Sequence, residues 1–361
     1  MEKLRVFESF SGIGCQSMAL RNLGIDFEVV GISEVDKYAL LAYDVIHNEP
    51  YDIEIPSKEE MLKEFNDKHI AYNFSTNKSE MPRKIEDIEK LYKAHIRCKN
   101  YGDIRLINPS ELPKMDLFTY SYPCKNISIA GKGAGLEKNS GTQSSLVWDC
   151  FKIIEYHKPK YLLMENVKNL VGKKHKPQFD LICEELEKIG YNNYWKVLDG
   201  KDFGVPQQRE RVMMVSIRKD IDDNTFEMPK GYPLTKTVRD ILQDDVDDYL
   251  YKNKKYEFVN QKRVIAKFID GNFDQAKRIY KIDSYSPTIC VKYDTLNILL
   301  DDGKVRILSP LECWRLMGIK DEDFYKVESL GFPKGKLYER AGRGIVIPML
   351  EEIFRNLFLN K

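Results

Sequence analysis

Leu4-Arg-Val-Phe-Glu-Ser-Phe-Ser-Gly-Ile-Gly14 begins with the alternation of a β-strand and ends in a glycine turn. Residues 15–23 then carry apolar side chains at helical spacing, and Gly24 is a suitable C-terminal cap. Strand, glycine turn and helix are the opening of a nucleotide-binding βαβ unit, in which glycines let the backbone approach a ligand closely. The third glycine of the dinucleotide fingerprint is missing, so this stretch alone is equally compatible with an ordinary tight turn.

Strand-like and helical patterns continue to alternate along the first 217 residues. Strands are expected at 27–33, 115–119, 160–164, 193–198 and 211–217, and helices at 37–43, 57–68, 83–98, 148–154 and 179–189. This alternation predicts an α/β fold, and the buried runs indicate a parallel sheet. Residues 51–100 read as a surface insertion without chemistry. After Arg218, acidic turns and basic clusters indicate a smaller, irregular domain, and helical patterns return at 309–317 and 345–359.

The bulk composition limits the class of protein. The chain has 361 residues, 42% of them hydrophobic and 31% charged, which is typical of a globular protein. No apolar run approaches the ~20 residues of a membrane span, and no signal-peptide pattern precedes the first strand. The seven cysteines include no Cys-x-x-Cys pair, so we expect no metal site, no disulfide framework and a cytoplasmic location. The net charge of +1 excludes a global basic field.

Four polar residues follow predicted strands: Glu34, Asp103, Cys124 and Glu165. Ligands of open α/β sheets bind outside the carboxyl ends of the strands. Glu34 lies about 20 residues after the glycines, where an acid binds a ribose hydroxyl in this fold, but it also suits a helix N-terminus. Cys124 lies in Tyr120-Ser-Tyr-Pro-Cys-Lys-Asn-Ile-Ser128, ahead of a glycine-rich loop. A thiolate there is a strong nucleophile, although a buried structural cysteine fits the same pattern.

Taken in order, the motifs resemble those of the DNA cytosine-5 methyltransferases. Those similar to family motifs are Phe10-Ser-Gly-Ile-Gly14, Glu34-Val-Asp36, Gly102-Asp-Ile104, Tyr122-Pro-Cys-Lys125, Glu165-Asn-Val167, Gln208-Arg-Glu-Arg211, the segment 306–318 and Ala341-Gly-Arg-Gly-Ile345. The resemblance implies a Rossmann-like S-adenosylmethionine-dependent methyltransferase domain with a smaller, irregular target-recognition domain. We expect the catalytic and cofactor-binding domain at 1–217, target recognition at 218–335, and a C-terminal segment, 336–361, that packs back on the catalytic domain.

The resemblance also implies residue roles. Cys124 would add to carbon 6 of cytosine, Glu165 would bind ring nitrogen 3 and the exocyclic amine, Arg211 would hold the carbonyl oxygen, and Arg209 would favour the thiolate. The residues expected to bind the cofactor are Phe10, Gly12, Ile13, Gly14, Glu34, Val35, Asp103, Ile104, Pro123, Arg343 and Ile345. Those expected to contact DNA are Ser128, Gln207 and Thr288.

Double-stranded DNA is the expected partner of a monomeric enzyme, with the target base flipped out of the helix. A separate cognate restriction endonuclease, as in restriction-modification systems, is left open. An RNA-directed enzyme is an alternative, but the Cys-Phe-Thr segment of the tRNA-modifying branch is absent. A non-catalytic relative would not need Cys124, Glu165 and Arg211 together. A dehydrogenase would explain only the glycine turn.

One position departs from the family pattern. The tenth motif usually reads Gly-Asn, whereas this chain has Gly342-Arg343. A permanent guanidinium charge near the sulfonium of S-adenosylmethionine needs a compensating anion. That anion could be the carboxylate of the methionine tail, or Arg343 could point into solvent. A third reading is a cofactor with a carboxylate on the transferred carbon, carboxy-S-adenosylmethionine, which would give carboxymethylcytosine.

Overall fold

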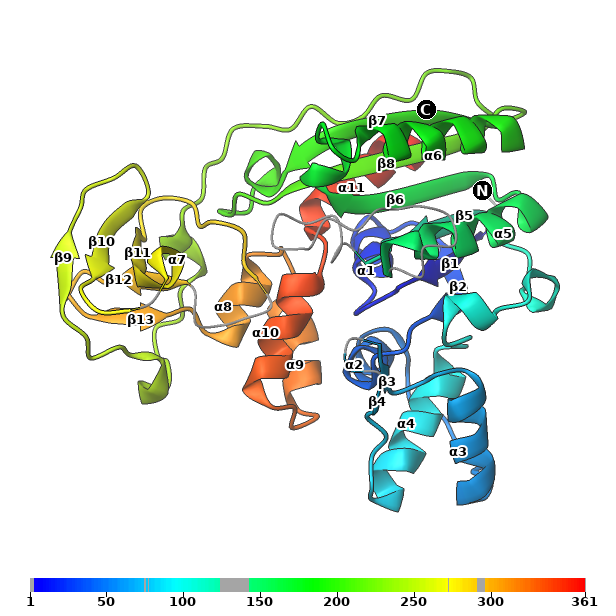
Figure 1. Ribbon diagram of the computed structural model, residues 1–361, viewed down its shortest axis with the longest axis horizontal. Helices are drawn as coiled ribbons and strands as arrows, with labels where there is room; N and C mark the ends of the chain where they lie inside the picture. The colour runs from blue at the N-terminus through cyan, green and yellow to red at the C-terminus, as the bar shows by residue number, and fades with distance from the viewer. Residues whose placement is uncertain are drawn as a thin grey trace. The chain divides into compact units, whose positions relative to one another are not determined.

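The computed structural model describes residues 3–74, 76, 78–123, 143–271, 273–290 and 296–360, and the chain forms two compact units (Figure 1). The first unit consists of Met1–Val197, Glu210–Pro229 and Ile353–Lys361, and the second of Leu198–Arg209 and Lys230–Glu352. The boundaries of these two units differ from the domain limits expected from the sequence. Residues 198–209 and 336–352 belong to the second unit and not to the first. The side-chain amide of Gln207 explains part of this difference, since it bonds to Ile289 and Leu316 of the second unit. The roles of the two units are not decided by their boundaries.

A six-stranded sheet with the order β2-β1-β5-β6-β8-β7 forms the centre of the first unit. Its strands are β1 (Leu4–Ser9), β2 (Phe27–Ser33), β5 (Leu117–Tyr120), β6 (Tyr161–Val167), β7 (Tyr191–Asp199) and β8 (Glu210–Arg218). The pairs β1–β2, β1–β5 and β5–β6 are parallel, and β6–β8 is antiparallel. The predicted α/β class is therefore confirmed.

The helices of the first unit also follow the sequence patterns closely. They are α1 (Cys15–Asn22), α2 (Lys37–His47), α3 (Lys58–Asp67), α4 (Ile85–Arg97), α5 (Val147–His157) and α6 (Lys176–Ile189). A two-stranded ribbon, β3 (Tyr72–Asn73) with β4 (Lys78–Ser79), lies between α3 and α4. At the C-terminus, α11 (Ile347–Phe354) begins within the second unit and continues into a π-helix (Arg355–Leu359) that belongs to the first. No helix among the described residues is long and apolar enough to cross a membrane.

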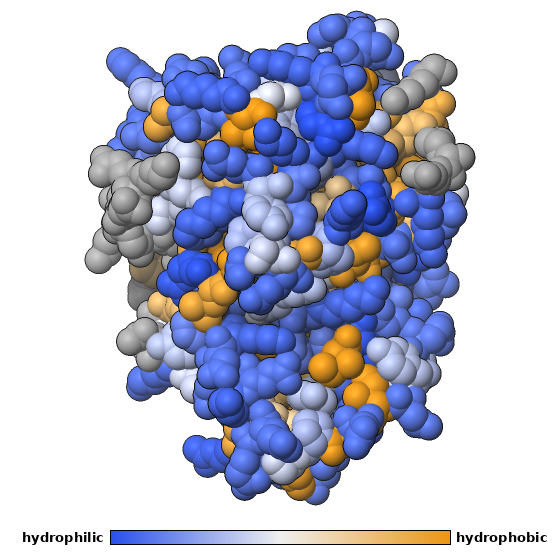
Figure 2. All heavy atoms as spheres, turned by 90° about the vertical axis from the view of Figure 1, so that its right-hand side faces the viewer, coloured by the Kyte–Doolittle hydropathy of each residue, from blue (hydrophilic) through white to orange (hydrophobic). Residues whose placement is uncertain are grey.

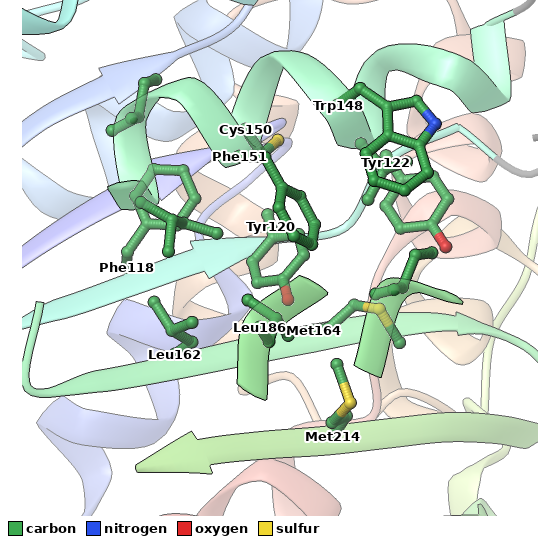
Figure 3. Packing of buried hydrophobic residues seen from close by; sticks show 14 of the residues in the cluster. Phe118, Tyr120, Tyr122, Trp148, Cys150, Phe151, Leu162, Met164, Leu186 and Met214 are labelled. Atoms are coloured by element: carbon green, nitrogen blue, oxygen red, sulfur yellow. The ribbon is translucent and has the colours of Figure 1, made fainter. Parts of the chain in front are cut away.

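The sheet is buried because helices supply apolar side chains to it. Figure 3 shows Phe118 and Tyr120 of β5 with Met164 of β6 and Met214 of β8 in one cluster, to which α5 contributes Trp148. Phe118 and Tyr120 lie two positions apart on β5, so their side chains share one face of the pleated sheet. A second apolar cluster joins α2 with α3 and α4. The segment 51–100 is therefore not only a surface insertion, because it builds this second core.

The second unit contains more regular structure than its sequence suggested. Its five-stranded sheet has the order β13-β12-β11-β10-β9. The strands are β9 (Tyr256–Phe258), β10 (Val264–Phe268), β11 (Arg278–Lys281), β12 (Asn297–Leu299) and β13 (Val305–Ile307), and the helices are α7 (Asp274–Lys277), α8 (Pro310–Arg315), α9 (Asp321–Glu328) and α10 (Lys334–Arg343). Strands of three to five residues carry too little alternation to be distinguished from loops in a sequence.

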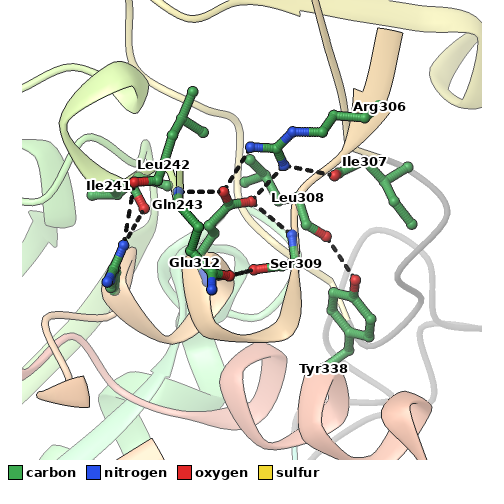
Figure 4. Close-up of polar contacts among 10 residues, drawn as sticks. Ile241, Leu242, Gln243, Arg306, Ile307, Leu308, Ser309, Glu312 and Tyr338 are labelled. Carbon is green, nitrogen blue, oxygen red and sulfur yellow. Dashed lines mark hydrogen bonds and ion pairs between the residues drawn. The ribbon is translucent and has the colours of Figure 1, made fainter. Parts of the chain in front are cut away.

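A buried ion pair connects β13 to α8 in this unit (Figure 4). Both guanidinium NH groups of Arg306 lie 2.7 Å from the carboxylate of Glu312, and neither side chain is more than 2% exposed. The same carboxylate accepts hydrogen bonds from the backbone N–H groups of Gln243 and Ser309. Glu312 thus joins three separate segments, and its two bonds to Arg306 are charge-assisted.

We expect Glu312→Gln to destabilise the second unit strongly. Removing one partner of a buried pair leaves the other charge uncompensated, which costs about 3–5 kcal/mol. Urea unfolding followed by tryptophan fluorescence measures the loss, since Trp314 lies on α8. The matched control is Asp247→Asn, which breaks the exposed Lys334–Asp247 pair of the same unit and should change stability little. Equal effects of the two substitutions would contradict this account of Glu312.

Candidate functional site

The carboxyl ends of β1, β2 and β5 meet at one edge of the first unit's sheet. Strand β1 lies between β2 and β5, and Ser9 at its end is in register with Ser33 and Tyr120. The chain leaves β1 in one direction for β2, and β5 is added on the other side, so this is a topological switch point. The glycine turn, Glu34 and the segment before Cys124 therefore lie around the place where open α/β sheets bind ligands.

The glycine turn after β1 is held in an unusual backbone conformation. Phe10, Gly12 and Gly14 have φ values of 54°, 57° and 73°. A Cβ on Gly14 would lie 2.3 Å from Nε2 of His47, which donates a hydrogen bond to the carbonyl oxygen of Ile13 at 3.0 Å. A Cβ on Gly12, in contrast, would meet nothing within 4 Å. Gly14 is thus required by packing, while Gly12 leaves open space on the ligand side of the turn.

Glu34 joins the glycine turn to the helix that follows β2. One carboxylate oxygen accepts the N–H of Gly12 at 2.9 Å, and the other accepts those of Val35 and Asp36 at 2.8 Å. The N-cap of α2 is Asp36 and not Glu34, because the Asp36 side chain accepts the N–H of Tyr38. The Glu34 carboxylate therefore holds the glycine turn and the start of α2 together. These contacts fit a bound nucleoside.

Asp103 lies at the same edge but has more partners than the sequence suggested. Its carboxylate is 2.8 Å from Nδ1 of His69 and receives hydrogen bonds from the guanidinium and backbone N–H of Arg105. Burial raises the pKa of the Asp103 carboxyl, but these hydrogen bonds outweigh it and keep the pKa below its usual value. The Arg105 guanidinium also lies 4.3 Å from the ring centroid of Phe74. An adenine amine would therefore share the carboxylate with Arg105 and His69.

His69, Phe74 and Arg105 were missed by sequence reasoning. Two of them belong to the segment 51–100, which showed no recognisable motif. Ile104 is buried beside Asp103, and Val35 is half-buried beside Glu34. The only sequence signal for Arg105 is its place directly after the Gly102-Asp-Ile104 motif.

Cys124 and Ser128 lie outside the described residues, but the chain on either side of that gap is fixed. The carbonyl oxygen of Pro123 accepts a hydrogen bond from the Ser144 hydroxyl at 3.0 Å. The carbonyl oxygen of Tyr122 accepts one from the side-chain amide of Asn166 at 3.1 Å. Both donors were missed as functional residues, although Asn166 is part of the quoted Glu-Asn-Val motif. They position the backbone that leads into Cys124.

Glu165, the residue before Asn166, forms an ion pair with Arg211. Nε of Arg211 lies 3.0 Å from Oε1 of Glu165, and both side chains are 14% exposed. They project from the neighbouring antiparallel strands β6 and β8, where Glu165 is in register with Met213. The structure thus brings together two of the four predicted catalytic residues. A carboxylate beside a guanidinium, partly open to solvent, can recognise a planar ring that carries both donors and acceptors.

Arg209 has a different environment from Arg211, because it belongs to the second unit. Its guanidinium donates to the carbonyl oxygens of Gly342 and Gly344 at 2.9 and 2.8 Å, and the side chain is buried. These contacts hold the two glycines of the tenth motif in place. They give Arg209 a structural role, and its predicted effect on the thiolate stays a prediction.

The predicted DNA contacts in the second unit are also engaged in the fold. Gln207 is fully buried, and its amide bonds to the carbonyl oxygen of Leu316 and the N–H of Ile289. A buried amide with both ends bonded gives Gln207 a structural role, and its predicted DNA contact stays a prediction. The Thr288 hydroxyl donates to the carbonyl oxygen of Gln208 at 2.7 Å, but its oxygen can still accept a hydrogen bond.

Arg343 is the last residue of α10, and Ile345 lies in the short connection that follows. The Arg343 guanidinium forms an ion pair with Glu339, one turn earlier in the same helix, and the side chain is half exposed. Ile345 is buried. Lys336 and Arg340 contact the same Glu339 carboxylate, so Arg343 shares this anion with two other cations.

A buried carboxyl lies behind the glycine turn and was not noticed in the sequence. Glu8 of β1 is fully buried, and its oxygens accept hydrogen bonds from the Tyr43 hydroxyl at 2.6 Å and from the backbone and hydroxyl of Ser17 at 3.1 and 3.0 Å. It therefore ties β1 to α1 and α2 at the root of the turn. Burial raises the pKa of Glu8 to about 7, against the lowering effect of its hydrogen bonds.

The comparisons with known proteins agree with this arrangement. Residues 75–359 match the family model described as C-5 cytosine-specific DNA methylase. The Type II methyltransferase M2.ScrFI of Lactococcus lactis subsp. cremoris is 40% identical over 98% of this chain and 99% of its own length. This chain belongs to the C-5 cytosine-specific DNA methylase family. It transfers a methyl group from S-adenosylmethionine to carbon 5 of cytosine in DNA.

Two further relatives extend the comparison. The orphan methyltransferase M.SssI of Spiroplasma monobiae is 31% identical over 98% of this chain and 96% of its own length. The crystal structure of S. pombe Dnmt2 methyltransferase matches with a TM-score of 0.65 and 17% identity, and each chain is covered to 99%. At that identity the likeness shows the shared fold, which is the Rossmann-like methyltransferase fold expected from the sequence.

Glu8 gives this methyltransferase a pH-dependent stability. The folded-state pKa of about 7 is above the ordinary value of 4.5, so the folded protein binds the proton more tightly. The stabilisation is complete below about pH 4.5, declines as the pH rises, and is lost above the folded-state pKa. The full loss amounts to about 3 kcal/mol.

We expect Glu8→Gln to flatten this dependence. The free energy of unfolding, measured in urea at several pH values between the two pKa values, should fall with pH in the wild type and less steeply in the variant. Glu28→Gln on the neighbouring strand is the control, since Glu28 is half-buried and its substitution should leave the slope unchanged. A wild-type slope that persists in Glu8→Gln would show that another group causes it.

Proposed function

We propose that this enzyme methylates a cytosine that is flipped out of a specific sequence in duplex DNA, through a covalent adduct with Cys124. The observation that best supports this mechanism is the Glu165–Arg211 pair. It lies on β6 and β8, and Asn166, the residue after Glu165, bonds to the carbonyl oxygen of Tyr122 two residues before Cys124. The hydrogen bond from Asn166 to Tyr122 therefore connects the strand that carries Glu165 to the segment that leads to Cys124.

Cys124 would act as the nucleophile, because carbon 5 of cytosine reacts poorly with an electrophile. Addition of the thiolate to carbon 6 turns the ring into an enamine, whose carbon 5 is electron-rich. After methyl transfer, loss of the proton from carbon 5 and expulsion of the Cys124 thiolate restore the aromatic ring. Ser144 and Asn166 would support these steps by holding the carbonyl groups of Pro123 and Tyr122.

Glu165 and Arg211 would bind the polar edge of the flipped base. The Glu165 carboxyl would face ring nitrogen 3 and the exocyclic amine, and the Arg211 guanidinium the carbonyl oxygen at position 2. Their contact at 3.0 Å pre-orients both side chains before the base arrives. Charge that develops on the ring during thiolate addition would be stabilised by fixed groups in a partly buried site.

S-Adenosylmethionine supplies an electrophilic methyl group on a sulfonium. We propose that Glu34 binds its ribose hydroxyls and Asp103 its adenine amine, with Val35 and Ile104 against the ring. The turn from Phe10 to Gly14, including Gly12 and Ile13, would surround the methionine end, together with Pro123, Arg343 and Ile345. The open space at Gly12 and the hydrogen bond between its N–H and the Glu34 carboxylate support this placement.

The Arg343 position does not favour a second cofactor. Carboxy-S-adenosylmethionine would need a guanidinium directed at its carboxylate, whereas Arg343 is directed at Glu339, which it shares with Lys336 and Arg340. We therefore propose methylcytosine as the product.

Duplex DNA is the proposed substrate, and the named relatives support it because they are DNA methyltransferases of the type II and orphan classes. Ser128 and Thr288 would contact the DNA backbone. The type II class also makes a separate restriction endonuclease a proposed companion. A monomeric, cytoplasmic enzyme is part of the same proposal.

Cys124→Ser should abolish methylation and preserve cofactor binding. A serine hydroxyl supplies almost no anion at neutral pH, so we expect a loss of several orders of magnitude in kcat. Calorimetric binding of S-adenosylhomocysteine should be unchanged, which separates loss of chemistry from loss of fold. Duplex DNA with 5-fluorocytosine at the target should form a covalent adduct with wild type and Cys183→Ser, a control thiol on α6, but not with Cys124→Ser. Substantial turnover by Cys124→Ser would overturn the covalent mechanism.

The segment Lys230–Val305 of the second unit should select the DNA sequence. It precedes Arg306, where the next family motif begins, and contains most of the five-stranded sheet. Grafting the corresponding segment of a relative with another target should move the methylated site, as read by bisulfite sequencing. The reciprocal chimera is the control and should acquire this enzyme's site. If both chimeras keep the specificity of their catalytic domain, target selection lies elsewhere.

A further inference from the structure

A second concave site lies at the opposite edge of the first unit's sheet. A pocket of about 440 Å³ is lined by residues at the amino ends of β1, β5 and β6 and at the carboxyl end of the antiparallel strand β8. Arg5, Asp116, Lys160 and Arg218 mark these four strand ends. The C-terminal end of α5 and the turn after it form another wall, with Tyr156 and Lys158.

This pocket is strongly cationic, although the chain as a whole has a net charge of only +1. Five of its lining residues are lysine or arginine, and Asp116 is the one carboxylate among them. Like charges repel at close range, so such a gathering favours the binding of an anion. Figure 2, seen from the side where the N-terminus lies in Figure 1, shows a mostly hydrophilic face with separated apolar patches.

Asp116 organises part of this charge without cancelling it. Its carboxylate bonds to the Arg5 guanidinium at 2.8 and 3.1 Å and lies 3.2 Å from Nζ of Lys160. Burial raises the pKa of Asp116, but the hydrogen bonds from Arg5 and Lys160 outweigh it and lower the pKa to about 2. Arg218 is fixed in the same way by Asp220 and by the carbonyl oxygen of Lys158.

Two further cations have no such partner. Within the described part of the chain, the ammonium groups of Lys114 and Lys158 make no hydrogen bond or ion pair. The backbone of Lys158 is nevertheless fixed, since its N–H bonds to the carbonyl oxygen of Ile154 and its own carbonyl oxygen accepts from Arg218. Lys158 adopts a left-handed conformation with φ of 46°, which is uncommon for a residue other than glycine or asparagine. The backbone of Lys158 is thus fixed at the rim of the pocket, while its ammonium group remains available to a ligand.

The size and rim of the pocket indicate the class of ligand. Its volume falls in the range of small-molecule sites, which is about 300–1,000 Å³, and is too small to admit a DNA duplex. The Tyr156 ring at the rim is 61% exposed and offers a flat surface for stacking. We propose that this pocket binds a small phosphate-bearing ligand of the nucleotide class, with the phosphate between Lys114 and Lys158 and the base against Tyr156.

This site is separate from the catalytic edge. Asp116 precedes β5 and Tyr122 follows it, and at ~3.3 Å per residue their separation of six positions in the sequence spans roughly 20 Å. None of the residues that would bind S-adenosylmethionine or cytosine lines the pocket. The inference therefore does not depend on the proposed mechanism.

Calorimetry on the full-length enzyme tests the proposal, with S-adenosylhomocysteine at saturation to block the cofactor site. Guanosine monophosphate should bind saturably, inorganic phosphate should bind more weakly, and guanosine should not bind. The double variant Lys114→Gln/Lys158→Gln should weaken nucleotide binding at least about tenfold. Tyr156→Ala should weaken nucleotide binding and leave phosphate binding unchanged.

The matched control is Lys84→Gln/Lys90→Gln, which removes two exposed lysines at the start of and within α4, away from the pocket. This variant should bind the nucleotide like wild type. Binding lost equally in both double variants would indicate a general charge effect and overturn the site. Absence of saturable binding at millimolar nucleotide, or binding of guanosine as tight as that of its monophosphate, would also overturn it.

Discussion

Parallel pairing of β1 with β2 and β5 is the constraint on which the catalytic site depends. Once Ser9 is in register with Ser33 and Tyr120, the turns that follow these strands must meet at one edge. Glu34 stabilises that meeting, because a single carboxylate accepts N–H groups from Gly12 and from the turn before α2. The glycine turn and Glu34 are therefore one hydrogen-bonded structure.

The fold of the first unit could be predicted because its strands and helices carry strong local patterns. The strand at 27–33 was placed correctly to the residue, and β5 and β6 were displaced by one to three residues at their ends. Long-range contacts could not be predicted. Nothing near Asp103 in the sequence indicates that His69 binds it, because the backbone turns between α3 and β3 create that contact. The second unit's short strands were unpredictable for the opposite reason, since they depend on pairing and not on local pattern.

The two arginines of the motif Gln208-Arg-Glu-Arg211 show why a motif does not assign roles by itself. Side chains two apart on a strand share a face, so Arg209 and Arg211 would be expected to act together. The chain instead passes from the second unit to the first between residues 209 and 210. Arg209 saturates the carbonyl groups of Gly342 and Gly344, whereas Arg211 meets Glu165. Only the hydrogen-bond partners distinguish the two.

Three glutamates of this chain illustrate how partners decide between structure and chemistry. Glu312 is fully buried, and its two oxygens receive Arg306 and two backbone N–H groups, so no acceptor position is left for a ligand. Glu8 is equally buried but lacks a cationic partner in its network, and its charge is therefore the one that pH can remove. Glu165 is partly exposed and paired with Arg211 at 3.0 Å, which orients its carboxylate. Since all three sit within or beside family motifs, a carboxylate available to a reactant is identified by its partners and its access to solvent, and not by its place in a motif.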